Sequence, residues 1–199
     1  MAQVLVVGSV ALDSVRTPFG QAEETLGGSA TYFSYAASFF VPVRLVAVVG
    51  EDFPGAHLDL LRAREVDLAG LEVAPGKTFR WTGEYGYDLD EATTLATHLG
   101  VFADFRPRLP PHFRKTPFLF LGNIDPDLQR EVLRQLERPR LVALDTMNYW
   151  IDGKREALLG VLQEVDALLV NDAEARQLTR EPSLARAARA ILGLGPGSW

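Results

Sequence analysis

Short apolar runs rich in β-branched residues alternate with segments of helical periodicity, and this alternation constrains the fold more than any other feature. The apolar runs predict buried strands at 3–9, 43–50, 118–122, 140–145 and 166–171. The periodic segments predict helices at 29–40, 54–65, 125–138, 153–163, 172–180 and 183–192. Parallel strands need long crossover connections, which are usually helical. The sequence therefore predicts an α/β fold with a mostly parallel sheet covered by helices on both faces.

One segment, 77–102, departs from this pattern. Within it, aromatic residues and glycine alternate with more polar residues at Phe79, Trp81, Gly83, Tyr85 and Tyr87. A period of two is typical of a half-exposed strand. A second β-like stretch, 92–102, follows a polar turn at 88–91. We expect 71–102, together with 14–20, to form a small antiparallel flap inserted into the α/β core. The alternative is a hairpin at the edge of the main sheet.

Charge and composition exclude several classes of protein. The 199 residues carry a formal net charge of −6, so the chain has no basic footprint for nucleic acid or an anionic membrane. The sequence contains no cysteine, which excludes disulfides, thiolate metal sites and a cysteine nucleophile. The N-terminal stretch has no basic leader, and no apolar run approaches the roughly 18 residues that span a bilayer. We therefore expect a cytoplasmic protein.

Two glycines precede the apolar stretch in "LGGSATYFSYAASFF" (26–40). The lysine of a Walker loop and the three glycines of a dinucleotide fingerprint are both missing. Gly27 and Gly28 have no Cβ, so a ligand or another backbone segment can approach closely. Ser29 is a candidate cap for the helix that follows, which is apolar on nearly all sides and expected to be largely buried. Local chemistry favours a turn plus a cap over a ligand site, and both readings stay open.

Polar residues follow the predicted strands at the positions where ligands bind in doubly wound sheets, the carboxyl ends of the strands. Taken singly, each is typical of a helix cap or a turn. Together they predict the lining of a polar pocket; they are Asp13, Asp52, Asn123, Asp145 and Asn171.

An ordered set of motifs resembles the PfkB/ribokinase family of sugar and nucleoside kinases. The motifs span the whole chain in the family's order: "VVGSVALDSV" (6–15), "LGGSATYFSYAASFF" (26–40), "VVGEDFPG" (48–55), "LGNIDP" (121–126), "LDTMNYWI" (144–151) and "VNDAEARQLT" (170–179). The resemblance implies a ribokinase-like three-layer α/β/α domain over 1–199, with the flap as the small β lid. It also implies ATP- and Mg²⁺-dependent phosphorylation of a hydroxyl of a sugar, sugar acid or nucleoside.

The resemblance assigns roles to individual residues. Asp13 matches the carboxylate that binds substrate hydroxyls, and Gly27 and Gly28 match the diglycine on which the sugar rests. Asn123 falls at a further substrate contact. Asn171 and Glu174 match the Asn-x-x-Glu element near the nucleotide phosphates, whose glutamate holds magnesium through water. The alternative for Glu174 is a first-turn glutamate that complements the helix dipole.

Two departures from the family pattern limit these assignments. Tyr32 stands where the family's first signature has a sugar-binding asparagine, so the sugar contacts are altered. The sequence contains no Gly-Ala-Gly-Asp, the family's anion hole and general base. We therefore expect that the C-terminal ATP-binding half is missing, that no residue here is the catalytic base, and that the chain is inactive alone.

Two further expectations concern partners. The alternative to an enzyme is a non-catalytic polyol-binding or dimerising module derived from a kinase. The resemblance and the aromatic flap also allow a homodimer paired through the lid. Arg80 in the flap is expected to face solvent, with contact to an anionic substrate as the alternative.

Overall fold

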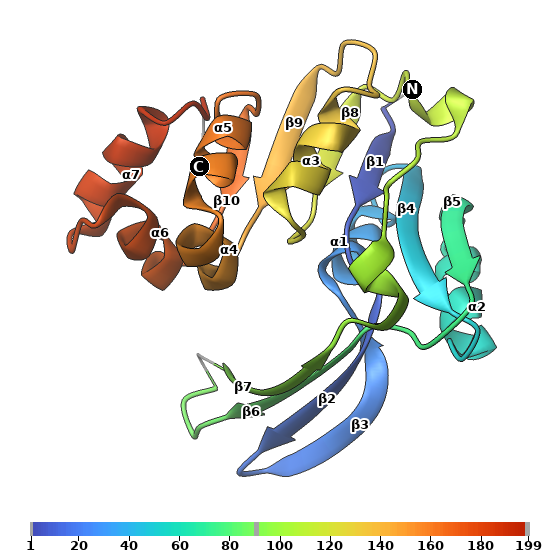
Figure 1. Ribbon diagram of the computed structural model, residues 1–199. Helices are drawn as coiled ribbons and strands as arrows, with labels where there is room; N and C mark the ends of the chain where they lie inside the picture. The colour runs from blue at the N-terminus through green and yellow to red at the C-terminus, as the bar shows by residue number, and fades with distance from the viewer. Residues whose placement is uncertain (1, 90–91, 198–199) are drawn as a thin grey trace. The chain divides into compact units, whose positions relative to one another are not determined.

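The computed structural model describes residues 2–89 and 92–197 (Figure 1). The chain divides into two compact units, one formed by 1–7 with 107–199 and the other by 8–106. Among the described residues, no helix has both the length and the apolar character needed to cross a bilayer.

The main sheet has six strands in the order β10-β9-β8-β1-β4-β5. Its strands are β1 (Val4–Val7), β4 (Val43–Gly50), β5 (Asp67–Ala74), β8 (Phe118–Leu121), β9 (Leu141–Asp145) and β10 (Ala167–Leu169). The pairs β1–β8, β8–β9, β9–β10 and β4–β5 are all parallel. The predicted α/β fold with a mostly parallel sheet is therefore confirmed.

The unit formed by 1–7 and 107–199 contains five α-helices among its described residues. They are α3 (Pro126–Leu133), α4 (Asn148–Gly153), α5 (Arg155–Leu162), α6 (Asp172–Thr179) and α7 (Leu184–Leu192). A short 3₁₀ helix, η2 (Pro111–Phe113), precedes β8. Strand β1 is buried at all four positions, as expected of a central parallel strand. The helix predicted at 153–163 is confirmed as α5, whereas the short helix α4, which ends at Gly153 just before it, was not predicted.

The unit formed by 8–106 contains a second sheet, with strands in the order β3-β2-β6-β7. These strands are β2 (Ala11–Thr17), β3 (Gly20–Gly27), β6 (Arg80–Tyr85) and β7 (Ala92–His98). Strand β2 pairs with β3 in antiparallel and with β6 in parallel fashion. The predicted hairpin strands thus lie in their own sheet, and residues 71–74 belong to β5 of the main sheet. Part of the predicted turn at 88–91 lies outside the described residues.

Helices α1 (Ser29–Ala37) and α2 (Gly55–Ala63) and the 3₁₀ helix η1 (Gly100–Asp104) complete this unit. The expectation that the apolar helix after Gly28 is largely buried is wrong. Only Ala30, Thr31 and Ser34 of α1 are buried. The larger side chains of this segment are on the surface, where Phe40 is 86% exposed. Small residues on one face let the helix pack closely, and they decide its orientation in place of the aromatic residues.

Candidate functional site

Asp13 lies in β2, directly after the buried pair Ala11 and Leu12. Its carboxylate accepts a hydrogen bond from the backbone N–H of Gly28. Burial raises the pKa of Asp13 from 3.8 to about 6, and the hydrogen bond from Gly28 opposes that shift. The structure therefore holds the Asp13 carboxylate where its ionisation is unfavourable, and the backbone N–H of Gly28 is the donor beside it.

Gly27 and Gly28 make this position possible. A Cβ on Gly27 would lie 2.0 Å from Oδ2 of Asp13, so any larger residue there would displace the carboxylate from this position. Gly28 has a φ of +94°, and a Cβ there would lie 2.4 Å from the backbone oxygen of Ser9. Both glycines thus permit a close approach, and the groups that approach are Asp13 and the Ser9 backbone. The predicted diglycine shapes the surroundings of Asp13.

The start of α1 is capped by Ser9, and the prediction that Ser29 caps the helix is wrong. The N-cap position is Gly28, and no side chain bonds from it to the helix. The hydroxyl of Ser9 accepts the N–H of Ser29 at 3.2 Å, and its backbone oxygen accepts the N–H of Ala30 at 3.1 Å. Two of the unpaired N–H groups at the helix start are satisfied by a loop distant in sequence.

Tyr32 approaches Asp13 from α1. Its hydroxyl donates to the backbone oxygen of Leu26 at 3.2 Å, while the residue stays 61% exposed. Burial is the main cause that raises the pKa of Tyr32, followed by the charges of Asp13 and Tyr85. The two tyrosines and the carboxylate are therefore close neighbours.

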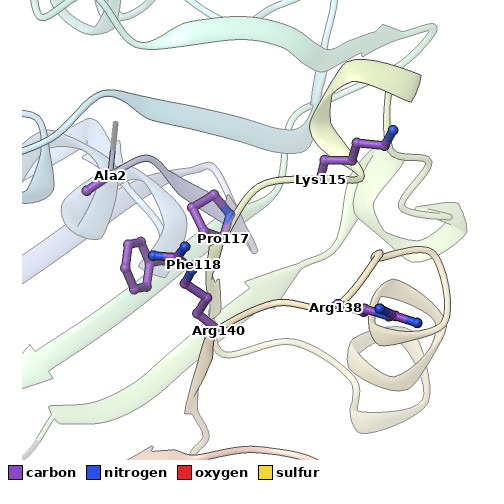
Figure 2. Close-up of a pocket in the computed structure, with 6 residues that line it drawn as sticks. All are labelled: Ala2, Lys115, Pro117, Phe118, Arg138 and Arg140. Atoms are coloured by element: carbon purple, nitrogen blue, oxygen red, sulfur yellow. The ribbon is translucent and has the colours of Figure 1, made fainter.

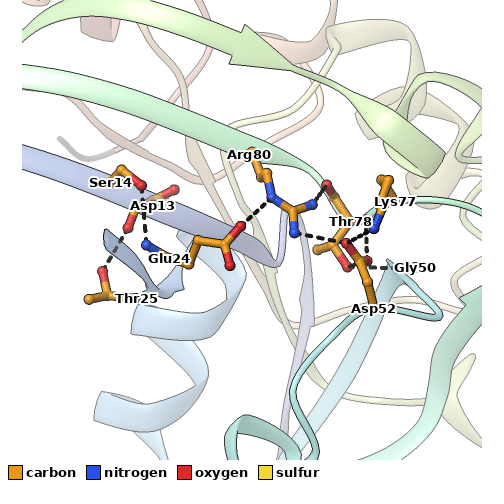
Figure 3. A network of polar contacts seen from close by, with 9 residues as sticks. All are labelled: Asp13, Ser14, Glu24, Thr25, Gly50, Asp52, Lys77, Thr78 and Arg80. Atoms are coloured by element: carbon orange, nitrogen blue, oxygen red, sulfur yellow. Dashed lines mark hydrogen bonds and ion pairs between the residues drawn. The ribbon is translucent and has the colours of Figure 1, made fainter. Parts of the chain in front are cut away.

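Asp52 follows β4 and lies in a different environment (Figure 3). Its Oδ1 accepts both the backbone N–H and the hydroxyl of Thr78, each at 2.8 Å. Its Oδ2 lies 2.8 Å from Nη2 of Arg80. Burial acts to raise the pKa of Asp52, but these hydrogen bonds and the charge of Arg80 lower it to about 2. The carboxylate holds the segment that leads into β6.

Arg80 extends the network to β3 (Figure 3). Its Nε lies 2.8 Å from Oε1 of Glu24, and its Nη1 donates to the backbone oxygen of Thr78 at 3.1 Å. Glu24 has a φ of +48° and lies at an irregularity in the pairing of β2 with β3, next to Asp13. The guanidinium of Arg80 thus has three partners within the chain and is only 25% exposed. The expectation that Arg80 faces solvent is therefore wrong, because its guanidinium is paired within the chain.

Asn123 lies after β8, in the other unit. Its side-chain oxygen is buried and accepts no hydrogen bond from the described residues. A buried amide oxygen without a donor is costly, so its position fits a polar ligand or an ordered water. The backbone N–H of Asn123 donates to the carboxylate of Asp145 at the end of β9.

Asp145 is the most perturbed described carboxyl in this unit. Burial, and then the charge of Glu174, raise its pKa to about 7, while backbone hydrogen bonds from Thr146 and Asn123 lower it. Burial also raises the pKa of Glu174. The charge of Glu174, from a different element, is thus close enough to oppose the ionisation of Asp145. Such a pair is stabilised by a cation.

Asn171 and Glu174 form a capping box at the start of α6. The side chain of Asn171 accepts the N–H of Glu174 at 2.8 Å, and Oε2 of Glu174 accepts the N–H of Asn171 at 2.9 Å. A helix cap, which the sequence left open as one role for Asn171, is therefore present in the structure. The second oxygen of Glu174, Oε1, accepts no hydrogen bond from the described residues, and it remains available to a hydrated cation.

A cavity of about 520 Å³ lies elsewhere in the same unit (Figure 2). Its lining residues precede strands β1, β8 and β9 or begin them, so the cavity is at the amino ends of the strands. They are Ala2, Lys115, Pro117, Phe118, Arg138 and Arg140. None of the predicted site residues lines it. Arg140 and Asp145 lie at opposite ends of β9, so this cavity is separate from the candidate site.

The structure groups the predicted site residues by unit. Asp13, Gly27 and Gly28 are in contact within one unit, and Asn123, Asp145 and Glu174 adjoin one another within the other. Sequence reasoning named Asp145 only as a polar residue at a strand end. Its pairing with Glu174 gave no sequence signal, because 29 positions separate the two residues. The Arg80–Glu24 pair was missed for the same reason.

No protein-family model matches the sequence, and no curated protein matches it. Solved structures do match. A protein from E. coli, described as a ribokinase II and solved with ATP and Mg²⁺, matches with a TM-score of 0.78 at 16% identity, over 98% of this chain and 70% of that one. A PfkB protein from Polaromonas sp. JS666 matches with a TM-score of 0.76 at 16% identity, over 98% and 74%.

A nucleoside kinase from Burkholderia thailandensis, solved in complex with inosine, matches with a TM-score of 0.72 at 17% identity, over 94% of this chain and 66% of that one. The similarity is structural and extends over nearly all of the present chain. At these identities it establishes the fold. The chain therefore has the α/β fold of the ribokinase, PfkB and nucleoside kinase structures.

Proposed function

We propose that this chain is the substrate-binding part of an ATP- and Mg²⁺-dependent kinase that phosphorylates a hydroxyl of a sugar, sugar acid or nucleoside. The fold supports the kinase class. The observation that carries the proposal is Asp13, a half-buried carboxylate held over Gly27 with its pKa raised to about 6. Such a group gains most from a ligand that donates hydrogen bonds to it.

Asp13 has the chemistry of a polyol receptor. A carboxylate accepts hydrogen bonds from two vicinal hydroxyls, and charge-assisted bonds of this kind are stronger than neutral ones. Hydroxyl donors also stabilise the charged form of the carboxylate, so substrate binding lowers the pKa of Asp13. The N–H of Gly28 orients the carboxylate before the substrate arrives.

Asp145 and Glu174 are the residues that would hold magnesium. Mg²⁺ keeps several waters and uses few protein carboxylates, and the described residues contain no cluster of three or more metal-binding side chains. When bound, the ion neutralises charge on the nucleotide phosphates. The ion would also offset the charge of Glu174 that acts on Asp145, which favours the ionised form of Asp145.

The proposal assigns binding, and not phosphoryl transfer, to the residues of this chain. The family's Gly-Ala-Gly-Asp supplies both the anion hole and the general base, and the sequence does not contain it. Loss of one oxyanion-type donor alone costs about 10²–10³ in rate. We expect no turnover in a coupled assay of ADP release.

Titration calorimetry with a panel of aldoses, aldonates and nucleosides tests the proposal. We expect saturable binding by the wild-type chain and a loss of about 30–100-fold in Asp13→Asn, because a charge-assisted pair of hydrogen bonds is lost. Asp59→Asn is the matched control, since Asp59 is an exposed carboxylate of the same unit that forms a salt bridge with Arg62. Equal affinity in wild type and Asp13→Asn, or ADP release by the purified chain, contradicts the corresponding part of the proposal.

A further inference from the structure

Gln129 is a polar side chain of α3 that is completely buried, at 0% exposure. Its amide nitrogen Nε2 donates to the backbone oxygen of Gly122 at 2.9 Å and to that of Asp145 at 3.1 Å. We call this pair of hydrogen bonds the Gln129 bridge. It uses one side chain to join two segments that are distant in the sequence.

The Gln129 bridge spans the point where strands β8 and β9 separate. The regular pairing of the two strands ends one residue before Gly122 and one residue before Asp145. Gly122 is held on its other side, because its N–H donates to the backbone oxygen of Val7 in β1 at 2.8 Å. Asp145 is paired on its other side with Leu169 of β10. Both segments are therefore fixed laterally, and the Gln129 bridge sets the gap between them.

Two residues of the candidate site lie on the segments that are joined in this way. Asn123 directly follows Gly122 in the chain, and its backbone N–H donates to the carboxylate of Asp145. This direct bond crosses the same gap as the Gln129 bridge, so a wider gap would break it. Binding sites tolerate displacements of only about 0.5 Å from their productive geometry. The Gln129 bridge is thus in a position to control the site.

The Gln129 amide is not optimised for stability alone. Its oxygen, Oε1, is buried and accepts no hydrogen bond from the described residues. A buried acceptor without a donor is unfavourable, and methionine would occupy a similar volume without that cost. What methionine cannot supply is the two N–H groups of the Gln129 bridge. This observation favours a role that depends on where the two segments are held.

Gln135 forms a comparable bridge at a different place in the same unit. Its Nε2 donates to the backbone oxygen of Pro107 at 2.8 Å and to that of Glu131 at 3.1 Å. Its Oε1 accepts the N–H of Leu109 at 2.9 Å. Both ends of this amide are paired, as expected of a glutamine with a purely structural role. None of its partners belongs to the candidate site, so Gln135 is a matched control for Gln129.

We propose that Gln129 is a positioning residue for the magnesium side of the candidate site. By fixing the gap between β8 and β9, it keeps Asn123 and the Asp145 carboxylate in place for a hydrated cation before the ion binds. Gln129 acts through the backbone, because both of its N–H groups donate to backbone oxygens. This inference rests on the proposed function, in which Asp145 and Glu174 hold the ion.

Amide NMR titrations with MgCl₂ compare the wild-type chain with Gln129→Met and Gln135→Met. We expect Gln129→Met to bind Mg²⁺ at least about tenfold more weakly, because loss of a group that orients metal ligands typically costs about 10–100-fold in affinity. Gln135→Met removes the same kind of side chain and the same number of bonds to backbone oxygens. It is expected to change the affinity by less than about twofold, since distant sites act independently.

Hydrogen exchange gives a second readout, which follows the gap itself. The N–H of Asn123 is bonded to a carboxylate, so we expect it to exchange slowly in wild type and in Gln135→Met. We expect at least about tenfold faster exchange in Gln129→Met. Thermal unfolding measures the loss of stability that the two variants share.

The wild-type chain carries the test if Gln129→Met fails to fold. Addition of Mg²⁺ is then expected to shift the side-chain amide signals of Gln129, because the bridged segments respond to the ion, and to leave those of Gln135 unchanged. Unchanged signals from both glutamines in a chain that binds Mg²⁺ would overturn the positioning role.

The outcomes distinguish this inference from the proposed function. If wild type binds Mg²⁺ and Glu174→Gln weakens binding while Gln129→Met does not, the positioning role is overturned and the magnesium site stands. If Gln135→Met weakens binding as much as Gln129→Met, the effect is one of general stability, and the positioning role is again overturned. If wild type binds no Mg²⁺, the magnesium part of the proposed function fails and this inference fails with it.

Discussion

Asp13 and Asp52 lie in the same unit of the molecule, but their surroundings shift the pKa of the same kind of side chain in opposite directions. Asp52 accepts two hydrogen bonds from Thr78 and pairs with Arg80, and its pKa is lowered to about 2. Asp13 has one backbone donor, Gly28, and its pKa is raised to about 6. Both aspartates closely follow an apolar strand-like run in the sequence, so sequence position does not distinguish them.

The difference teaches how a structural carboxylate differs from a binding one. The partners of Asp52 replace the water that it loses on folding, so its charge stabilises the native state. Asp13 loses water without full replacement, so its charge destabilises the native state until a ligand supplies donors. Sites that keep such a cost are frequently functional.

The largest effect is expected from Asp52→Ala. The substitution leaves buried donors of Thr78 without an acceptor and removes a partner of Arg80, so we expect a loss of about 3 kcal/mol in the free energy of unfolding. The pKa of Asp52 is lowered to about 2, so its stabilisation is complete above pH 4 and is lost as the pH falls through about 2. Urea unfolding between pH 2 and 7 measures this, with the exposed Asp59→Ala as the control. A loss under about 1 kcal/mol would contradict the claim that the charge of Asp52 stabilises the native state.

Asp13→Asn is expected to act in the opposite direction. The folded protein binds the proton of Asp13 more tightly than the unfolded chain, so the charged carboxylate costs stability above pH 6, and this cost disappears near pH 4. We expect the variant to be about 1–2 kcal/mol more stable than wild type at pH 7, less than a full conversion of the pKa shift because the group is partly solvated. Asparagine also accepts the N–H of Gly28. Destabilisation at pH 7 would mean that Asp13 is structural, like Asp52.

The carboxyl pair of the other unit sharpens the comparison. In Glu174→Gln the capping box is retained, because glutamine also accepts the N–H of Asn171, but the charge beside Asp145 is removed. We expect the pKa of Asp145 to fall below about 7 and the affinity for Mg²⁺ to weaken by at least about tenfold. Carbon-detected NMR titration of the carboxyl groups follows both quantities.

Glu156→Gln is the matched control for this experiment, since Glu156 is an exposed glutamate in the first turn of α5. It is expected to change neither the Asp145 titration nor Mg²⁺ binding. An unchanged pKa of Asp145 in Glu174→Gln would show that burial alone perturbs this carboxyl, and that the two groups do not form one site.

The smallest effect is expected at the start of α1, whose N-cap residue Gly28 donates its N–H to Asp13. Ser9→Ala removes the acceptor for the N–H of Ser29, at a cost of about 1 kcal/mol. Ser29→Ala keeps that N–H and is expected to cost less than about 0.5 kcal/mol. Thermal unfolding of the two variants compares them directly. Equal losses would assign the cap to both hydroxyls.

Most of the fold could be predicted because its signals are local. The run at 43–50 matches β4 residue for residue, since a buried parallel strand is apolar at nearly every position. Strand β3 was largely missed because its sequence, GQAEETLG, is exposed and charged. The extent of burial of α1 was predicted wrongly for a related reason: aromatic residues indicated a buried helix, whereas small residues make its packed face.

Less of the candidate site could be predicted. The sequence showed that Asp13, Asn123 and Asp145 are polar residues that follow predicted strands, but it did not distinguish their roles. Whether a carboxylate is compensated depends on side chains that pairing brings from elsewhere, such as Arg80 for Asp52. Gln129 falls within a predicted helix, 125–138, but the strand ends that its side chain joins gave no sequence signal.

The sequence by itself determined the alternation of strands and helices, the separate character of 77–102 and the polar strand ends. These follow from periodicity and from the conformational limits of single residues, which act over a few positions. Only the tertiary structure decided which carboxylates are compensated, which glycine makes room for Asp13, and which ring lies beside it. Those properties depend on desolvation and on contacts between residues far apart in the chain, and neither is encoded by any short stretch of sequence.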